Sequence, residues 1–279
     1  MPDHVLTVYR PMDLNNKEFI AKKVREDSNE LEMLRLLNTI PRKSDHIISL
    51  VDSFHGWVIL PKLATVKGYI DFGRNLSETK VSQLCLGLIK GLAYLHEHRI
   101  AHRDIKPDNL LVNNEDFRLI ITDFDTAMRV EDEDEEVNDQ CGTKHWMAPE
   151  VERKLRHSPI KADRWSCGYV ILYFLDKSKQ EGKHLKAFAN KLTAHDPKRR
   201  PSLLEWERLS DAPLLDVANV SNVGERKALR PFQGKMVVGR ENTPPPEVGT
   251  RGLAESDQKA RERGCFAASE RYGSLGLLI

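Results

Sequence analysis

One ordered series of short motifs constrains this chain more strongly than its composition does. The series begins with His-Arg-Asp-Ile-Lys-Pro-Asp-Asn at residues 102–109, and Asp123-Phe124-Asp125 follows nineteen positions after Asp104. The later motifs, in chain order, are Gly142-Thr143, Ala148-Pro149-Glu150 and Asp163-Arg164-Trp165-Ser166-Cys167-Gly168. Each motif alone is a weak signal, but the full set in this order and spacing is highly specific.

The residue types in this series suit phosphoryl transfer. That reaction needs positioning and charge neutralisation around the transferred group more than it needs covalent chemistry. A carboxylate must accept the proton of the attacking hydroxyl. An amide and a carboxylate can hold Mg²⁺, which is a hard cation that takes oxygen ligands. Lysines can neutralise phosphate charge, so the motifs together indicate a phosphoryl-transfer site.

On these motifs the sequence resembles the eukaryotic protein kinase family, and most closely its Ser/Thr members. The resemblance covers roughly residues 4–210 and implies an α+β, two-lobed fold with an abbreviated small β lobe and a mainly helical large lobe. We expect a kinase-like domain at 1–211, divided into lobes at about 1–63 and 64–211. The implied cofactors are ATP and Mg²⁺, and the implied partner is a protein substrate with a Ser or Thr acceptor.

The resemblance assigns roles to the catalytic motifs. Asp104 would be the catalytic base, and Lys106 would contact the γ-phosphate. Asn109 and Asp123 would ligate Mg²⁺. A lysine two positions after the catalytic aspartate is the Ser/Thr signature of the family, and Lys106 fits it. Thr143, in the activation segment, would touch Asp104 and Lys106.

Four further residues have implied structural roles. Glu150 would form a buried ion pair with Arg200, and Asp163 would hold the catalytic loop from the central helix. Arg103, which precedes the catalytic aspartate, would need a negative charge from the activation segment, often a phosphate in this family.

The small lobe matches the family less closely. Residues 19–24 resemble the third strand of the family, whose lysine holds the α- and β-phosphates. Lys22 and Lys23 are both candidates, and strand alternation places only one of them in the cleft. Glu30 resembles the helix glutamate that pairs with this lysine, although only eight residues separate it from Lys22.

Residues 57–63 resemble the fifth strand and the hinge. Leu60 would be the gatekeeper, and Lys62 and Leu63 would offer backbone groups to adenine. Periodicity and capping signals elsewhere predict strands at 4–10, 19–24, 47–54, 57–60 and 118–122, and helices at 28–37, 77–98, 164–175, 184–192 and 203–209. Residues 212–279, rich in Gly, Arg, Glu and Pro, predict a disordered tail.

The chain departs from the family in its phosphate-binding glycines. No glycine precedes Gly56, so we expect the Gly-rich loop to be missing, and the family's first strand with it. Either the chain is a fragment of a longer kinase, or nucleotide binding is weakened. Asp125 replaces a family glycine and would recruit the cation, repel Asp123, or simply be tolerated.

Two further departures lie in the large lobe. Residues 131–136 are all acidic, and Asp139 follows them. We consider two hypotheses for this run: it supplies the charge that Arg103 needs permanently, or it is a solvated acidic loop. In addition, only 36 residues separate Asp163 from Arg200, which shortens the surface on which the family docks substrates.

Composition excludes several other classes. The 43 Lys+Arg and 42 Asp+Glu residues give a net charge of +1, without the basic excess expected of a nucleic-acid binder. The longest strongly apolar run, at 169–175, is far too short for a membrane span, and no secretory signal is visible. The four cysteines form no metal-binding pair. We expect an intracellular protein without nucleic-acid or membrane partners.

A non-enzymatic alternative remains open. The missing Gly-rich loop and Asp125 favour a pseudokinase, which would act as a binding or scaffold module with weak or no catalysis. The presence of Lys22, Asp104, Lys106, Asn109 and Asp123 favours the enzyme.

Overall fold

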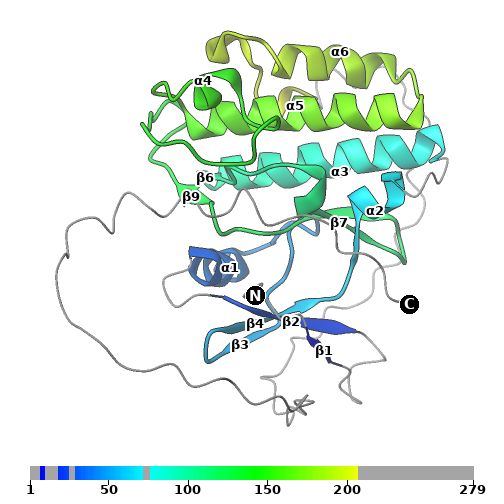
Figure 1. Ribbon diagram of the computed structural model, residues 1–279, viewed down its shortest axis with the longest axis vertical. Coiled ribbons are helices and arrows are strands. Elements are labelled where there is room, and N and C mark those ends of the chain that lie inside the picture. Colours follow the sequence, from blue (N-terminus) through cyan, green and yellow to red (C-terminus); the bar gives the residue numbers. More distant parts are fainter. Residues whose placement is uncertain (1–6, 10–17, 25–28, 72–75, 207–279) are drawn as a thin grey trace, which may run out of the picture.

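The computed structural model describes residues 7–9, 18–24, 29–71 and 76–206, and has two lobes of different composition (Figure 1). The small lobe combines an antiparallel sheet with one helix, and the large lobe is mainly helical. The mixed α and β architecture with an abbreviated small lobe agrees with the sequence prediction. The predicted tail at 212–279 lies outside the described residues.

The small-lobe sheet has the strand order β1-β2-β4-β3, and every pairing is antiparallel. Its strands are β1 (Thr7–Tyr9), β2 (Phe19–Lys23), β3 (Asp52–Phe54) and β4 (Trp57–Pro61), and its helix is α1 (Asn29–Thr39). Successive side chains of β2 and β4 point to opposite faces of the sheet, and Phe19, Ala21 and Ile59 form a small apolar cluster on one face. Val58 and Leu60 pack with Met33, Leu34 and Leu37 of α1 in the main core.

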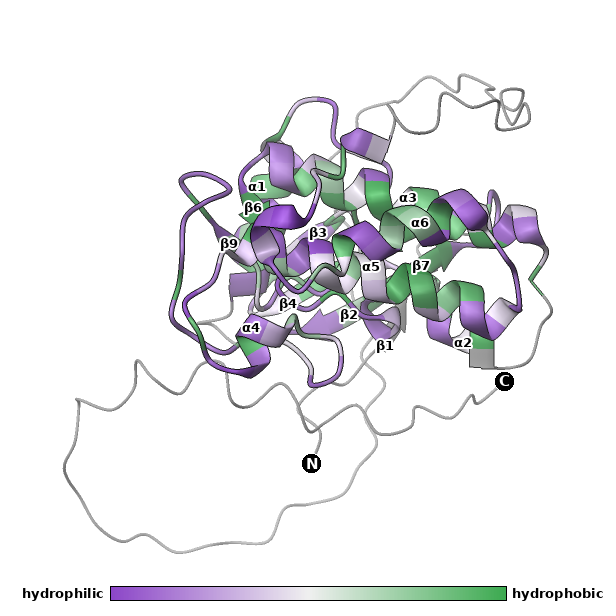
Figure 2. Cartoon of the chain, turned by 90° about the horizontal axis from the view of Figure 1, so that it is seen from above, coloured by the Kyte–Doolittle hydropathy of each residue, from purple (hydrophilic) through white to green (hydrophobic). Residues whose placement is uncertain are grey.

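Three helices that run side by side organise the large lobe (Figure 1). They are α3 (Glu78–Glu97), α5 (Pro159–Ser178) and α6 (Lys183–Leu192). Figure 2 shows hydrophobic residues along α3 and α5, while the loops around α4 (Pro149–Glu152) are mostly hydrophilic. The Ser77 side chain accepts a hydrogen bond from the Lys80 N–H, which confirms the predicted start of α3.

Short elements complete the large lobe. The segments β5 (Ala64–Thr65), β7 (Leu110–Asn113) and β8 (Arg118–Ile121) form one sheet, and β6 (Ile100–Ala101) pairs with β9 (Met128–Arg129). The remaining elements are α2 (Val66–Asp71) and two 3₁₀ turns, η1 (Pro107–Asn109) and η2 (Pro197–Arg199). In Figure 1, β7 lies on the side of α3 that faces the small lobe, and β6 and β9 lie near one end of this helix.

The predicted strand at 47–54 is wrong in its first half. Asp52–Phe54 pairs with β4, and the Val51 N–H donates to the Ile59 carbonyl of β4 at 2.9 Å, whereas the backbone at 46–48 pairs with the large lobe. The Ile121 N–H donates to the His46 carbonyl at 2.8 Å, and the Ile48 N–H donates to the Ile121 carbonyl at 3.0 Å. This segment connects the two lobes, so its backbone hydrogen bonds divide between two sheets.

Two helix predictions also changed. The central helix begins at Pro159 rather than at residue 164, because Ser158 caps it by accepting the Lys161 N–H and Pro159 occupies the first helical position. Of the predicted helix at 203–209, residues 205–206 are helical and the remainder lies outside the described residues. No helix in the described part of the chain is long and apolar enough to cross a membrane.

Candidate active site

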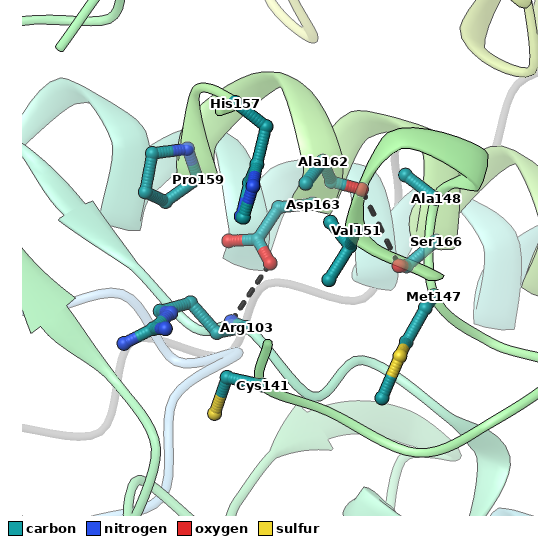
Figure 3. Close-up of a pocket in the computed structure, with 10 residues that line it drawn as sticks. All are labelled: Arg103, Cys141, Met147, Ala148, Val151, His157, Pro159, Ala162, Asp163 and Ser166. Atoms are coloured by element: carbon teal, nitrogen blue, oxygen red, sulfur yellow. Dashed lines mark hydrogen bonds between the residues drawn. The ribbon is translucent and has the colours of Figure 1, made fainter. Parts of the chain in front are cut away.

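The buried carboxylate of Asp163, on α5, holds the backbone of residues 102–109, which we call the catalytic loop. Both oxygens of Asp163 accept backbone hydrogen bonds: Oδ2 accepts one from the His102 N–H at 2.7 Å, and Oδ1 accepts one from the Arg103 N–H at 2.8 Å, which Figure 3 shows. Arg103 has a φ of 69°, a left-handed conformation that costs energy for a non-glycine residue. The two hydrogen bonds that Asp163 accepts offset that cost and fix the direction of the loop.

Within this loop, the side chains of Asp104 and Lys106 lie in contact, and Lys106 also contacts Thr143. The Lys106 ammonium donates to Asp104 Oδ2 at 2.8 Å and to Thr143 Oγ1 at 2.6 Å. Asn109 Nδ2 donates to Asp104 Oδ2 at 3.1 Å and to the Asp104 carbonyl at 2.9 Å. Asp104 is 7% exposed, and its Oδ1 has no hydrogen-bond partner among the described residues. That oxygen is available to accept a hydrogen bond from a ligand.

The backbone brings Asn109 and Asp123 together from different parts of the chain. The Thr122 N–H donates to the Asn109 carbonyl at 3.1 Å, which places Asp123 directly after this contact. Phe124 is fully buried and packs against His102, with 5.1 Å between the ring centroids and the ring planes tilted by 58°. The amide oxygen of Asn109 and the carboxylate of Asp123 are the type of donor that Mg²⁺ takes. Among the described residues, no cluster of three or more His, Cys, Asp or Glu side chains is arranged to hold a metal ion.

Lys22 connects the small lobe to this pair. Its ammonium lies 2.8 Å from Glu30 Oε2 and 3.0 Å from Asp123 Oδ1. Burial raises the pKa of Glu30, and the neighbouring ammonium only partly opposes this. Burial also acts to raise the pKa of Asp123, but the charge and hydrogen bond of Lys22 outweigh it and lower that pKa. Lys23, the other candidate, is exposed.

The predicted hinge residues lie at the end of β4 and directly after it. Leu60 is 3% exposed and belongs to the main core. The Lys62 N–H donates to the Glu18 carbonyl at 2.9 Å, and its ammonium pairs with the Glu18 carboxylate at the same distance. The N–H of Lys62 is therefore engaged within the protein, and Leu63 packs half-buried against the core.

Glu150 and Arg200 form a buried bidentate pair. Arg200 Nη1 and Nη2 donate to the two Glu150 oxygens at 2.5 and 2.8 Å. Arg200 also donates to the carbonyls of Lys161 and Ala194, both at 2.9 Å, and its guanidinium lies over the Trp165 ring. These contacts join α4, α5 and the end of the large lobe behind the catalytic loop.

The acidic run does not meet Arg103 directly. Arg103 pairs with Asp139, whereas Glu133 pairs with Arg164 and Asp134 pairs with Lys161. Glu136 lies 3.6 Å from the Arg156 side chain at the surface. Asp139, the acidic residue after the run, thus contributes a negative charge to Arg103, and several carboxylates of the run are paired with cations rather than only solvated.

Lys161 and Arg164 were not singled out by sequence analysis. Both lie within three residues of Asp163 on α5, and Arg164 is 4% exposed. A cation on an otherwise buried helix needs a countercharge, and this signal could have identified them as partners of the acidic run.

The cavity in Figure 3 lies under the catalytic loop and is too small for a nucleotide. It has a volume of about 20 Å³, enough for about one water molecule. The residues that line it include Arg103, Cys141, His157, and Asp163 and Ser166 of α5.

Comparison with known proteins gives a consistent result. The sequence profile described as "Protein kinase domain" matches residues 7–180. The serine/threonine-protein kinase shk2 of Schizosaccharomyces pombe is 33% identical over 147 residues, which cover 50% of this chain and 24% of shk2. PAK 5 of Rattus norvegicus is 27% identical over 168 residues, covering 57% of this chain and 23% of PAK 5.

A third relative is CBL-interacting protein kinase 16 of Oryza sativa subsp. japonica. It is 32% identical over 189 residues, which cover 60% of this chain and 40% of that protein. The matched part therefore spans about a quarter to two fifths of the length of these relatives.

Proposed function

Because the chain belongs to the protein kinase family, we propose that it transfers the γ-phosphate of ATP to Ser or Thr hydroxyls of a protein substrate. The observation that supports this most is the buried Oδ1 of Asp104, which has no partner among the described residues. It belongs to a side chain held by Lys106 and Asn109, and Asp123 lies beside them. A positioned acceptor within a cluster of phosphate- and cation-binding groups suits this reaction.

In this proposal Asp104 accepts the proton of the substrate hydroxyl at Oδ1. Lys106, held between Asp104 and Thr143, stabilises negative charge on the transferred group. Bound Mg²⁺ would neutralise phosphate charge, and Asn109 and Asp123 are the residues that would hold it. The lowered pKa of Asp123 keeps its carboxylate ionised at neutral pH, as cation binding requires.

The nucleotide would lie between the lobes. Lys22 would contact its α- and β-phosphates while Glu30 and Asp123 hold the lysine in position. Leu60 would border the adenine, and the hinge backbone around Leu63 would bind its edge. The preference for Ser and Thr rests on Lys106, two positions after Asp104, and on the Ser/Thr kinases among the relatives.

A transfer assay tests this proposal. The protein is given Mg·ATP and a generic basic protein substrate, and phosphoserine and phosphothreonine are measured. We expect Asp104→Asn to lower kcat by roughly 100-fold or more, because the hydroxyl loses its proton acceptor. The matched control is Asp108→Asn, since Asp108 has the same side chain but pairs with Lys67 at 2.9 Å. Equal activity of Asp104→Asn and the wild type would refute the assignment.

A second candidate function is a pseudokinase that binds nucleotide without efficient transfer. Two sequence features favour it: no glycine precedes Gly56, and Asp125 replaces the family glycine. Thermal stabilisation by Mg·ATP without phosphorylated product would support this function. Product formation that depends on Asp104 would exclude it.

A further inference from the structure

The charge environment of Arg103 suggests an additional positioning residue. Its side chain is 11% exposed, and it lies immediately before Asp104. Removing a guanidinium from water is costly unless a carboxylate and further hydrogen bonds compensate. The backbone N–H of Arg103 is already bound by Asp163, so the position of this residue affects where Asp104 points.

Asp139 provides that carboxylate. Its Oδ2 accepts a hydrogen bond from Arg103 Nη2. Three residues later, Gly142 has a φ of 111°, and a Cβ on it would come within 2.7 Å of the Arg103 carbonyl oxygen. The Thr143 hydroxyl oxygen, next in the chain, accepts a hydrogen bond from the Lys106 ammonium. The segment 139–143 therefore contacts the catalytic loop at three successive points.

The preceding part of the segment is anchored to α5 by charge as well. Glu133 pairs with Arg164, and its carbonyl accepts the Ser158 hydroxyl at 2.6 Å. Asp134 pairs with Lys161, whose hydrogen bond and charge lower the pKa of Asp134. Val137 and His157 exchange two backbone hydrogen bonds, at 2.9 and 3.1 Å. Asp139 is thus presented to Arg103 by a segment fixed on both sides.

The stretch between Asp125 and Gly142 has little capacity to carry an added phosphate. Between Asp125 and Gly142 the sequence contains a single hydroxyl residue, Thr126. The Thr126 hydroxyl donates to the His102 carbonyl at 3.0 Å, so it already holds the catalytic loop. The carboxylate of Asp139, which is part of the amino-acid sequence itself, supplies a negative charge beside Arg103 without any modification.

We propose that Asp139 is a positioning residue that fixes the catalytic loop through Arg103, so that the site is assembled without phosphorylation of this segment. The inference rests on the proposed phosphoryl transfer for its effect on rate, but its structural part can be measured without activity. Asp139 touches neither substrate nor nucleotide in this proposal and acts through Arg103.

The kinetic test uses protein that has been treated with phosphatase and checked by mass. We expect the wild type to remain active, and Asp139→Asn to lower kcat at least about tenfold with the KM for ATP changed less than about twofold. Asp139→Glu should restore most of the rate, because a carboxylate is again available. The matched control is Asp132→Asn, which removes the same charge from an exposed residue of the acidic run.

Hydrogen exchange gives the readout that is independent of activity. Asp139→Asn should speed exchange at residues 102–109, whereas Asp132→Asn should not, and exchange in α3 should stay unchanged in both as a check on folding. Unchanged loop exchange in Asp139→Asn, or loss of wild-type activity on phosphatase treatment, would overturn the proposal. Selective loop exchange with no transfer by the wild type would support the positioning role and refute the proposed transfer activity.

Discussion

At the scale of single residues, strand geometry distinguishes two identical neighbours. Lys22 and Lys23 carry the same side chain, but successive side chains of β2 point to opposite faces of the sheet. Lys22 reaches Glu30 and Asp123, while Lys23 is exposed. A phosphate-binding role therefore belongs to Lys22 in our proposal.

This difference predicts a contrast in nucleotide binding. Wild-type protein in Mg·ATP at 100 times the dissociation constant should gain about 2.7 kcal/mol of stability. We expect Lys22→Ala to lose most of this gain, because the phosphates lose their cation and two carboxylates are left close together. Lys23→Ala should keep it. Thermal unfolding with and without Mg·ATP measures both variants, and a loss confined to Lys23→Ala would reverse the assignment.

At the scale of elements, α5 positions much of the site. Its Asp163 holds the catalytic loop, and its Lys161 and Arg164 pair with Asp134 and Glu133 of the acidic run. Another face of α5 packs closely against α6. A Cβ on Gly168 would come within 2.7 Å of Leu192 Cβ and 2.8 Å of the Ala189 carbonyl oxygen. The two helices approach closely because glycine occupies this position.

The contact at Gly168 predicts a destabilising substitution. Gly168→Ala should lower the free energy of unfolding by about 1–3 kcal/mol, since the added methyl forces α5 and α6 apart. Urea unfolding measures the change. In the Thr193→Ser background the cost of Gly168→Ala should be smaller, because the substitution removes Thr193 Cγ2, which a Cβ on Gly168 would meet at 3.0 Å. Strictly additive effects would contradict the proposed steric cause.

At the scale of the whole molecule, the lobes meet where residues 46–48 pair with Ile121. His46 Nδ1 lies 2.8 Å from the Leu119 carbonyl oxygen, and the ring packs against Gly87 of α3. Burial lowers the pKa of His46, and burial also lowers that of His96 beneath the catalytic loop. Both histidines are therefore neutral in the folded protein at neutral pH.

These shifts predict that stability falls with acidification. Below the unfolded pKa of about 6.5, the unfolded chain binds protons that the folded chain does not, so stability is lost as pH decreases below that value. Each histidine contributes at most about 1.4 kcal/mol per pH unit. Urea unfolding between pH 7.5 and 5.5 measures the slope. His46→Asn should reduce it, whereas His145→Asn, at an exposed histidine, should not.

The sequence predicted much of the fold because many elements carry local signals. The Ser77 cap, the alternation in 19–24 and the apolar stripe of α3 all depend on residues close in the chain. The segment 47–54 was mispredicted because its apolar pattern is the same whether it pairs with β4 or with β8. Only the position of the large lobe decides between these partners.

The motif order by itself determined the family and the residues to examine, because its members have chemically specific types at fixed spacings. Tertiary structure alone decided three pairings: Lys22 rather than Lys23 with Glu30, Asp139 rather than residues 131–136 with Arg103, and Glu133 and Asp134 with α5. In each case several like-charged side chains compete within a few residues. Local sequence does not rank such competitors, since the choice depends on which one the packed backbone brings within hydrogen-bond distance of a buried partner.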